Sequence, residues 1–176
     1  MQRSLFHLIR EDWTANEKNW KTRLILILFR IAHACARGSS LVRMMTLPIL
    51  VGYRVFVEWL LCVELPAKTQ VGGGLRIYHG HALVVNDHTI IGRNCILRHC
   101  TTIGCALLPD DTQGPSPVIG DNVELGSNVC IIGGIHIGDG AQLGAGTVVV
   151  KDVPAGAVVV GNPARIIRRR EPSGLH

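Results

Sequence analysis

Residues 118–149 read VIGDNVELGSNVCIIGGIHIGDGAQLGAGTVV, and an aliphatic or small residue returns at every sixth position of this stretch and just beyond it. A second series of small or branched residues lies four positions further along each repeat. Each repeat thus has two inward side chains and one turn. This pattern predicts a short strand followed by a corner. The first series contains Ile119, Leu125, Ile131, Ile137, Leu143, Val149 and Ala155, and the second contains Val123, Val129, Ile135, Ala141, Thr147, Val153 and Val159.

The repeat predicts a parallel β-helix, because three such repeats close one triangular coil of about eighteen residues. Apolar side chains should stack inside the coil, while glycine and asparagine serve corners at which the backbone takes a positive φ. The same phase continues upstream at Leu65, Val71, Ile77, Leu83, Ile91, Leu97 and Ile103.

Two interruptions break this phase. The step from Leu83 to Ile91 is eight residues, which predicts a two-residue insertion around residues 86–88. The step from Ile103 to Ile119 is sixteen residues, and its surplus, PDDTQGPSP, is rich in turn residues. We therefore expect an extruded loop at about residues 106–118, since interruptions of a repeat map to surface loops that often help to form binding faces.

The chain before the coil has a different character, and two helices are expected there. Residues 20–37 carry a helical stripe of apolar residues. Residues 41–63, LVRMMTLPILVGYRVFVEWLLCV, predict a second helix that packs on the coil or a sister subunit, contacts a membrane peripherally, or spans it. We expect a helical region at 1–63, a β-helix domain at 64–167 and a basic tail at 168–176. The stripe consists of Leu24, Ile27, Leu28, Ile31 and Ala34, and the residues that argue against a span are Arg43, Pro48, Gly52, Arg54 and Glu58.

The composition fits a compact protein with a sizeable core, since only 18% of the 176 residues are charged and the mean hydropathy is +0.28. The six cysteines form no CxxC pair, so they are expected to be free thiols in a reducing compartment. No cleavable signal peptide is visible in MQRSLFHLIR, and the expected location is the cytoplasm, including the inner face of its membrane. The net charge of +5 permits attraction to anionic lipid or to a phosphate-bearing cofactor, and no nucleic-acid motif accompanies it.

Four histidines fall between residues 77 and 102, beside both interruptions. His79 and His99 are each the third residue of a repeat, and their separation of twenty residues equals one coil plus two inserted residues. They should therefore lie near one another on adjacent coils, at an outward corner. Imidazoles there suit proton transfer, because their ordinary pKa leaves a usable neutral base near pH 7.

Four segments carry a resemblance to a known family. Residues 143–167, LGAGTVVVKDVPAGAVVVGNPARII, resemble an ending shared widely among hexapeptide acetyltransferases. Residues 98–104, RHCTTIG, resemble the Arg-His-Gly-Val-Thr-Ile-Gly of polysaccharide acetyltransferases, and residues 78–80, YHG, fall where that type tends to read His-His-Gly. Residues 64–67, ELPA, resemble a segment that opens with an acidic residue fifteen positions before the catalytic histidine. The chain thus resembles the serine acetyltransferase family, and within it the colanic acid biosynthesis acetyltransferase type.

This resemblance implies a left-handed β-helix and transfer of an acetyl group from acetyl-CoA. It implies that His79 is the general base, oriented by Glu64, with His99 as its catalytic neighbour. The amides of Gly104 and Cys105 are candidates for binding the oxyanion. The pantetheine groove implied by the family is lined at the corners by Gly126, Ser127, Gly144 and Ala145, and Lys151, Arg165 and Arg168 could meet the CoA phosphates or be solvated surface charge.

The acceptor is expected to be a sugar hydroxyl. Serine acetyltransferases carry Arg-His-Pro in the extruded loop, whereas this chain has Pro115-Ser116-Pro117 and so lacks a cation that could clamp a carboxylate. We assign acceptor binding to His81, Ser116 and Asp87, with turn capping as the alternative for Asp87. A homotrimer with shared sites is expected, because a triangular coil offers flat faces and the low charge leaves apolar area to cover.

Three alternatives to this function stay open. Serine could be the acceptor, as in cysteine biosynthesis. A zinc enzyme of the γ-class carbonic anhydrase kind would need His79, His81 and His99 to converge on a metal. A non-catalytic assembly module would bind no CoA. We expect the acetyltransferase, with no resident metal.

Overall fold

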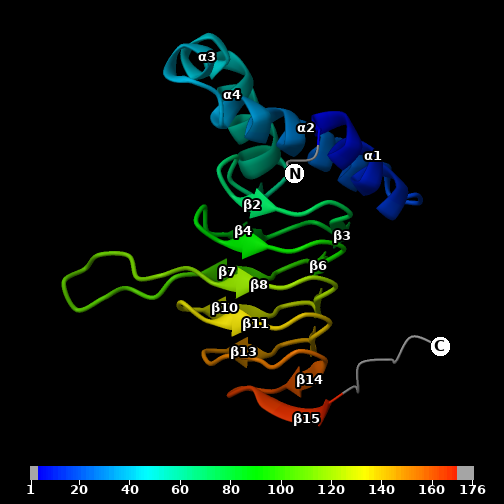
Figure 1. Cartoon of the computed structure of the whole chain (residues 1–176), viewed down its shortest axis with the longest axis vertical. Coiled ribbons are helices and arrows are strands. Elements are labelled where there is room, and N and C mark those ends of the chain that lie inside the picture. Colours follow the sequence, from blue (N-terminus) through cyan, green and yellow to red (C-terminus); the bar gives the residue numbers. More distant parts are fainter. Residues whose placement is uncertain (1–3, 170–176) are drawn as a thin grey trace.

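The computed structural model describes residues 4–169, and in it a column of stacked coils carries a helical cap at one end (Figure 1). The coils are a parallel β-helix with three sheets, so the expected fold is confirmed. Sheet A contains β1 (Val63–Glu64), β4 (Leu83–Val85), β7 (Thr102–Gly104), β10 (Cys130–Ile132) and β13 (Val148–Val149). Sheet B contains β2 (Gln70–Val71), β5 (Ile90–Ile91), β8 (Val118–Ile119) and β11 (His136–Ile137). Sheet C contains β3 (Arg76–Tyr78), β6 (Ile96–Arg98), β9 (Glu124–Leu125), β12 (Gln142–Leu143), β14 (Ala157–Val160) and an antiparallel last strand, β15 (Arg165–Arg169).

The corners between sheets B and C each contain a residue with positive φ. These residues are asparagine or glycine, which adopt this conformation at little cost. With corners turned in this way, successive strands stack and their apolar side chains fill a continuous core. The corner residues are Gly74, Asn94, Asn122, Gly140 and Gly156.

The last coil departs from the predicted phase, and Ala155 is exposed instead of buried. Val153 pairs with Ile137, sixteen residues earlier, whereas Val148 pairs with Cys130, eighteen residues earlier. The turn after β13 is therefore two residues short. This moves Ala155 to a corner and places Ala157 inside the coil, where it is fully buried.

The two-residue insertion lies in a different corner from the one predicted. Leu83 pairs with Val63, twenty residues earlier, whereas Val85 pairs with Ile103, eighteen residues later. Val85, and not Leu83, therefore takes the regular inward position. The extra residues thus belong to the corner between β3 and β4, which contains His79, and not to residues 86–88.

A loop leaves the coil between β7 and β8 and extends away from the column (Figure 1). It folds back on itself through a bridge between Leu107 and Gln113. Its returning end is held to the coil, because the Ser116 hydroxyl donates a hydrogen bond to Asn86 Oδ1 at 2.8 Å.

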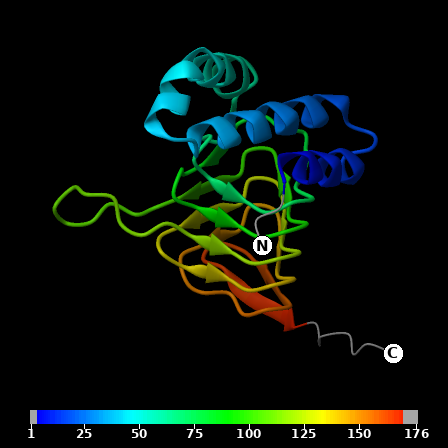
Figure 2. The same ribbon diagram turned by 45° about the horizontal axis from the view of Figure 1, so that its top comes forward.

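Helix α2 (Trp20–Ala36) lies across the end of the coil, with α1 (Leu5–Ala15) beside it (Figure 2). The predicted stripe is not the buried face of α2. Leu24 and Ala34 are exposed, and Ile27, Leu28 and Ile31 are only partly buried. Apolar residues surround most of this helix, so periodicity could not choose a face. The buried residues are Thr22, Ile25, Leu26, Phe29, Arg30 and Ala32.

Polar side chains determine this orientation, because they bind backbone groups at the open end of the coil. Thr22 Oγ1 donates to the carbonyl of Ile77 at 2.8 Å, and Asn16 Nδ2 donates to that of Leu75 at 2.8 Å. These backbone groups lie at the edge of the first coil, which is otherwise an unpaired end. The cap therefore closes the β-helix.

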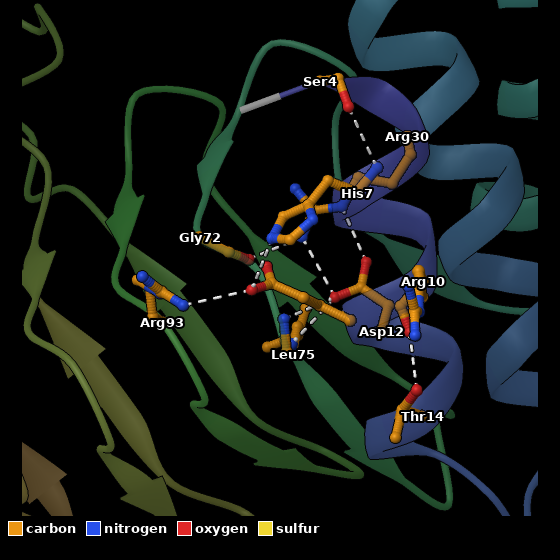
Figure 3. A network of polar contacts seen from close by, with 11 residues as sticks. Ser4, His7, Arg10, Asp12, Thr14, Arg30, Gly72, Leu75 and Arg93 are labelled. Atoms are coloured by element: carbon orange, nitrogen blue, oxygen red, sulfur yellow. Dashed lines mark hydrogen bonds and ion pairs between the residues drawn. The ribbon is translucent and has the colours of Figure 1, made fainter. Parts of the chain in front are cut away.

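A buried ion pair lies at the centre of this contact (Figure 3). Arg30 Nε donates to Asp12 Oδ2 at 2.8 Å, and both side chains are almost completely buried. The remaining Arg30 donors bind the carbonyls of Val71 and Gly72, each at 2.6 Å. Asp12 Oδ1 accepts from the amides of Gly74 and Leu75. Burial raises the pKa of Asp12, while Arg30 and these amides act in the opposite direction.

The second predicted helix is not continuous. It is divided into α3 (Ser40–Met45), α4 (Leu47–Tyr53) and a π-helix, η1 (Arg54–Leu60), and Val63 already belongs to β1. Pro48 lies in the first turn of α4, where its missing N–H costs no hydrogen bond. Within residues 4–169 no helix has the length and apolarity needed to cross a membrane.

Candidate acetyl-transfer site

The corners that lead from sheet C to sheet A stack along one edge of the column and carry the predicted histidines. Tyr78 pairs with Arg98, so His79 and His99 directly follow two aligned strands. Their ring centroids are 6.0 Å apart in an edge-to-face arrangement, as the spacing predicts. His99 Nδ1 is buried and has no hydrogen-bond partner among the residues that the structure describes.

His79 occupies the widened corner and has a φ of 55°. Histidine tolerates this left-handed conformation better than most residues with a Cβ, and such backbone is frequent at functional sites. The inserted residues separate His79 from Ala82, whose φ of 48° gives the ordinary corner. Cys100 N donates to the carbonyl of His81 at 2.9 Å, which fixes the two corners against each other.

Small residues continue the same edge below the histidines. Asn128 N donates to the carbonyl of His99, and Gly146 N donates to that of Ser127. A side chain at Gly126 would collide with the backbone of Ala145, since an added Cβ would lie 2.5 Å from its nitrogen. Gly126 therefore lets two neighbouring coils stack closely. The predicted cofactor residues form a line of small residues along this edge, namely Gly126, Ser127, Gly144 and Ala145.

Four other predicted site residues line a groove on the outer face of sheet A. The groove has a volume of about 400 Å³. One of its sides is the corner that follows β4, which contains no inserted residues. Ser116 is connected to this groove through Asn86. Asn86 Oδ1 accepts a hydrogen bond from the Ser116 hydroxyl, and Asn86 Nδ2 lies 3.6 Å from Cys105 Sγ. The groove is lined by Glu64, Asp87, Gly104 and Cys105, together with Arg54, Pro66, Val84, Val85, Asn86, Thr102 and Ile103.

Within one chain, the structure does not bring Glu64 to His79. Glu64 pairs with Val84 from β1, the terminal strand of sheet A, whereas His79 lies in the corner that joins sheet C to sheet A. Among the described residues no hydrogen bond or ion pair joins them. The two groups of predicted residues thus occupy an edge and a face of the same column.

The candidate cations lie toward the far end of the coil. Lys151 is exposed in the short turn after β13, and Arg165 and Arg168 are exposed on β15. The predicted tail begins inside this strand, and its residues 170–176 lie outside the described part of the chain. Residues 4–169 contain no group of three or more histidine, cysteine or acidic side chains that could hold a metal ion.

Asn86 and Arg98 were not predicted to take part in the site. Asn86 connects the loop to the groove, but its sequence position indicated only a turn. Arg98 makes an ion pair with Glu124 at 2.9 Å and lies 5.6 Å from the ring centre of Tyr78, so it stiffens the strand that precedes His99. A sequence signal for Arg98 existed in the motif that it shares with His99.

Cys95 has no such place in the site. Its side chain is fully buried, and its thiol donates to the carbonyl of Gly120 at 3.1 Å. Burial raises its pKa to about 11, so it is a neutral thiol at physiological pH. All six cysteines are free in the structure.

Comparison with known proteins connects this arrangement with acetyl transfer. Residues 116–151 match the bacterial transferase hexapeptide (six repeats) family. The putative colanic acid biosynthesis acetyltransferase WcaB of Escherichia coli K12 is 35% identical over 163 residues, which cover 89% of this chain and 96% of that protein. Serine acetyltransferase 2 of Arabidopsis thaliana is 37% identical over 109 residues, which cover 62% of this chain and 33% of that one.

Similarity to a solved structure extends over the helical cap as well. The soybean serine acetyltransferase apoenzyme superposes with a TM-score of 0.80 and 30% identity, covering 93% of this chain and 69% of that chain. Sequence similarity over almost the whole length of a named acetyltransferase and a shared fold lead to one assignment. The chain belongs to the hexapeptide-repeat transferase family and is an O-acetyltransferase of that family.

Proposed function

We propose that the protein transfers the acetyl group of acetyl-CoA to a sugar hydroxyl of a polysaccharide precursor, with His79 as general base. The observation that carries the proposal is the pair of imidazoles at the edge of the column, directly above a line of small residues. A thin acyl carrier can approach His79 along such an edge, whereas larger side chains would block it. The similarity to a colanic acid biosynthesis acetyltransferase supports a saccharide acceptor.

The proposed reaction is a direct transfer. His79 removes the proton from the acceptor hydroxyl while the oxygen attacks the thioester carbonyl. The amides of Gly104 and Cys105 stabilise the resulting oxyanion. When the tetrahedral intermediate collapses, the carbon–sulfur bond breaks and the CoA sulfur takes the proton from His79. The products are the acetyl ester and free CoA, and no acyl-enzyme forms.

The site is proposed to be shared between subunits of a homotrimer. Glu64 can orient and stabilise the His79 imidazolium only if the groove on sheet A of one copy meets the histidine edge of the next. The separation of these two groups within one chain supports this arrangement. Acceptor contacts are then assigned to Asp87 and Ser116 of the groove and to His81 of the edge.

Serine is the competing acceptor, because serine acetyltransferases are also among the relatives. The loop argues against it. Residues 105–117 include Asp110 and Asp111 and no lysine, arginine or histidine, so the loop provides no cation for the carboxylate of free serine. A sugar hydroxyl needs no such partner.

A thiol-release assay with acetyl-CoA tests both acceptors. Purified protein is offered serine, nucleotide sugars and oligosaccharides in parallel, and free CoA is measured. Saturable release with a saccharide and none with serine is the expected result. Saturable turnover with serine alone would show that serine, and not a sugar, is the acceptor. Binding of acetyl-CoA without any turnover would contradict the proposed role of His79 as general base.

A further inference from the structure

The segment that connects the cap to the coil is unusually exposed for its composition. Between residues 41 and 60 only Tyr53 and Val57 are buried. The exposed side chains are nevertheless large and apolar, and several lose less than half of their surface to the fold. The set that we call the cap surface consists of Leu41, Met44, Met45, Leu47, Ile49, Val51, Trp59 and Leu60. Apolar surface of this extent on a folded chain marks a contact with something else.

Charge identifies the kind of partner. From Lys18 to Val57 the sequence contains seven lysine and arginine residues and no aspartate or glutamate. Arg43 and Arg54 are exposed within the segment that carries the cap surface, and Arg37 is exposed at the C-terminal end of α2, just before that segment. Glu58 is the first carboxylate that follows, and it pairs with Arg54 at 3.3 Å.

A second copy of the chain related by a two-fold axis fits this surface poorly. A two-fold contact places each residue opposite the same patch of the partner, so cations would face cations with almost no carboxylate between them. An anionic lipid surface instead complements both features, because its headgroups attract the arginines while its acyl boundary accepts methionine, leucine and tryptophan side chains.

We infer that the cap surface binds peripherally to an anionic lipid bilayer. The helices lie along the membrane interface and do not cross it, in keeping with their short lengths. A cavity of about 490 Å³ joins this surface to the coil. Leu47, Val51 and Trp59 line one part of it, and Lys68 and Asp87 line another. Asp87 also lines the groove on sheet A, so membrane binding would present that side of the column to lipid-linked molecules.

Flotation with lipid vesicles tests this inference without any substrate, so its outcome is independent of the acetyl-transfer proposal. Full-length protein is mixed with vesicles of phosphatidylcholine alone or of phosphatidylcholine with phosphatidylglycerol, at low and high potassium chloride. The protein is expected to float with the anionic vesicles, and less so at high salt because exposed charges are screened. No flotation with either vesicle would overturn the inference.

Variants locate the contact. Met45→Glu with Leu60→Glu is expected to lower the bound fraction by about tenfold, because a carboxylate is repelled by the lipid charge and resists burial at the interface. Arg43→Gln should weaken binding to anionic vesicles only. Ile167→Glu is the matched control, since Ile167 is 64% exposed at the opposite end of the column, close to the 69% of Leu60.

Two further results would count against a lipid partner. Equal flotation of the double variant and of Ile167→Glu would show that the cap surface is not the part of the protein that contacts lipid. A lower particle mass for the double variant in light scattering, without vesicles present, would show that a second copy covers this surface. Circular dichroism spectra matching the parent would show that the substitutions leave the helices folded.

Discussion

His79 is placed by a local irregularity of the chain. Two extra residues widen the corner between β3 and β4, and the imidazole stands at the edge of the column beside His99. The neighbouring coils have shorter corners whose turned residue is Cys100 or Asn128. The insertion therefore distinguishes this corner from its neighbours, and the corner carries two exposed histidines, His79 and His81.

Replacement of this side chain gives the residue-scale prediction. His79→Ala should lower turnover by at least about a hundredfold, because a general base contributes on that scale, and should leave acetyl-CoA binding nearly unchanged. Steady-state kinetics and calorimetric titration with CoA measure the two effects. His136→Ala is the control, since His136 is exposed on β11 and lies outside the site. Turnover close to that of the parent in a folded His79→Ala protein would exclude the role of base.

At the scale of elements, α1 and α2 are joined to the first coil by hydrogen bonds as well as by apolar side chains of α2 in the common core, such as Ile25 and Phe29. Thr22, Asn16 and Arg30 all donate to backbone carbonyls of the coil edge. Asp12 is buried with Arg30 and accepts from the coil as well. The position of the cap on the coil therefore depends on a few polar side chains that reach specific backbone groups.

Removing one charge of this pair should destabilise the whole cap. Arg30→Met leaves the Asp12 carboxyl buried without its partner, and the free energy of unfolding should fall by about 3 to 5 kcal/mol. Denaturant unfolding measures the change. Arg10→Met, at an exposed position of α1, should cost less than about 0.5 kcal/mol. Asp12→Leu combined with Arg30→Met should recover part of the loss, and a loss no larger than that of Arg10→Met would refute the importance of the pair.

At the scale of the whole molecule, the proposed site requires that the groove on sheet A of one copy meet the histidine edge of the next. Light scattering is expected to give about three times the chain mass of 19.1 kDa. Mixed trimers provide the sharper measurement. Equal amounts of His79→Ala and Glu64→Ala chains, each of low activity, should recover roughly a quarter of the parent activity when assembled together, because random mixing rebuilds that share of intact pairs. A monomeric mass, or no recovery in verified mixed trimers, would show that the site is not shared in this way.

The periodic part of the sequence was sufficient for the coil. Inward positions such as Leu125 and Leu143 recur because each strand and corner has a fixed length, so the fold, the loop between β7 and β8, and the proximity of His79 to His99 could be predicted from spacing. Local rules of this kind are visible in a single chain because a corner is made by neighbours in sequence.

Only the tertiary structure decided which corners of the coil are two residues longer or shorter than the repeat, and how the helical cap is oriented. The exposure of Ala155 and the position of the insertion depend on which strands pair, and pairing is a contact between residues about twenty apart. The buried face of α2 depends on Arg30 and Thr22 meeting the coil, because apolar residues lie on most sides of this helix and do not select one. The placement of Glu64 on a strand of sheet A and of His79 in the corner between sheets C and A follows from strand pairing, which no short motif contains.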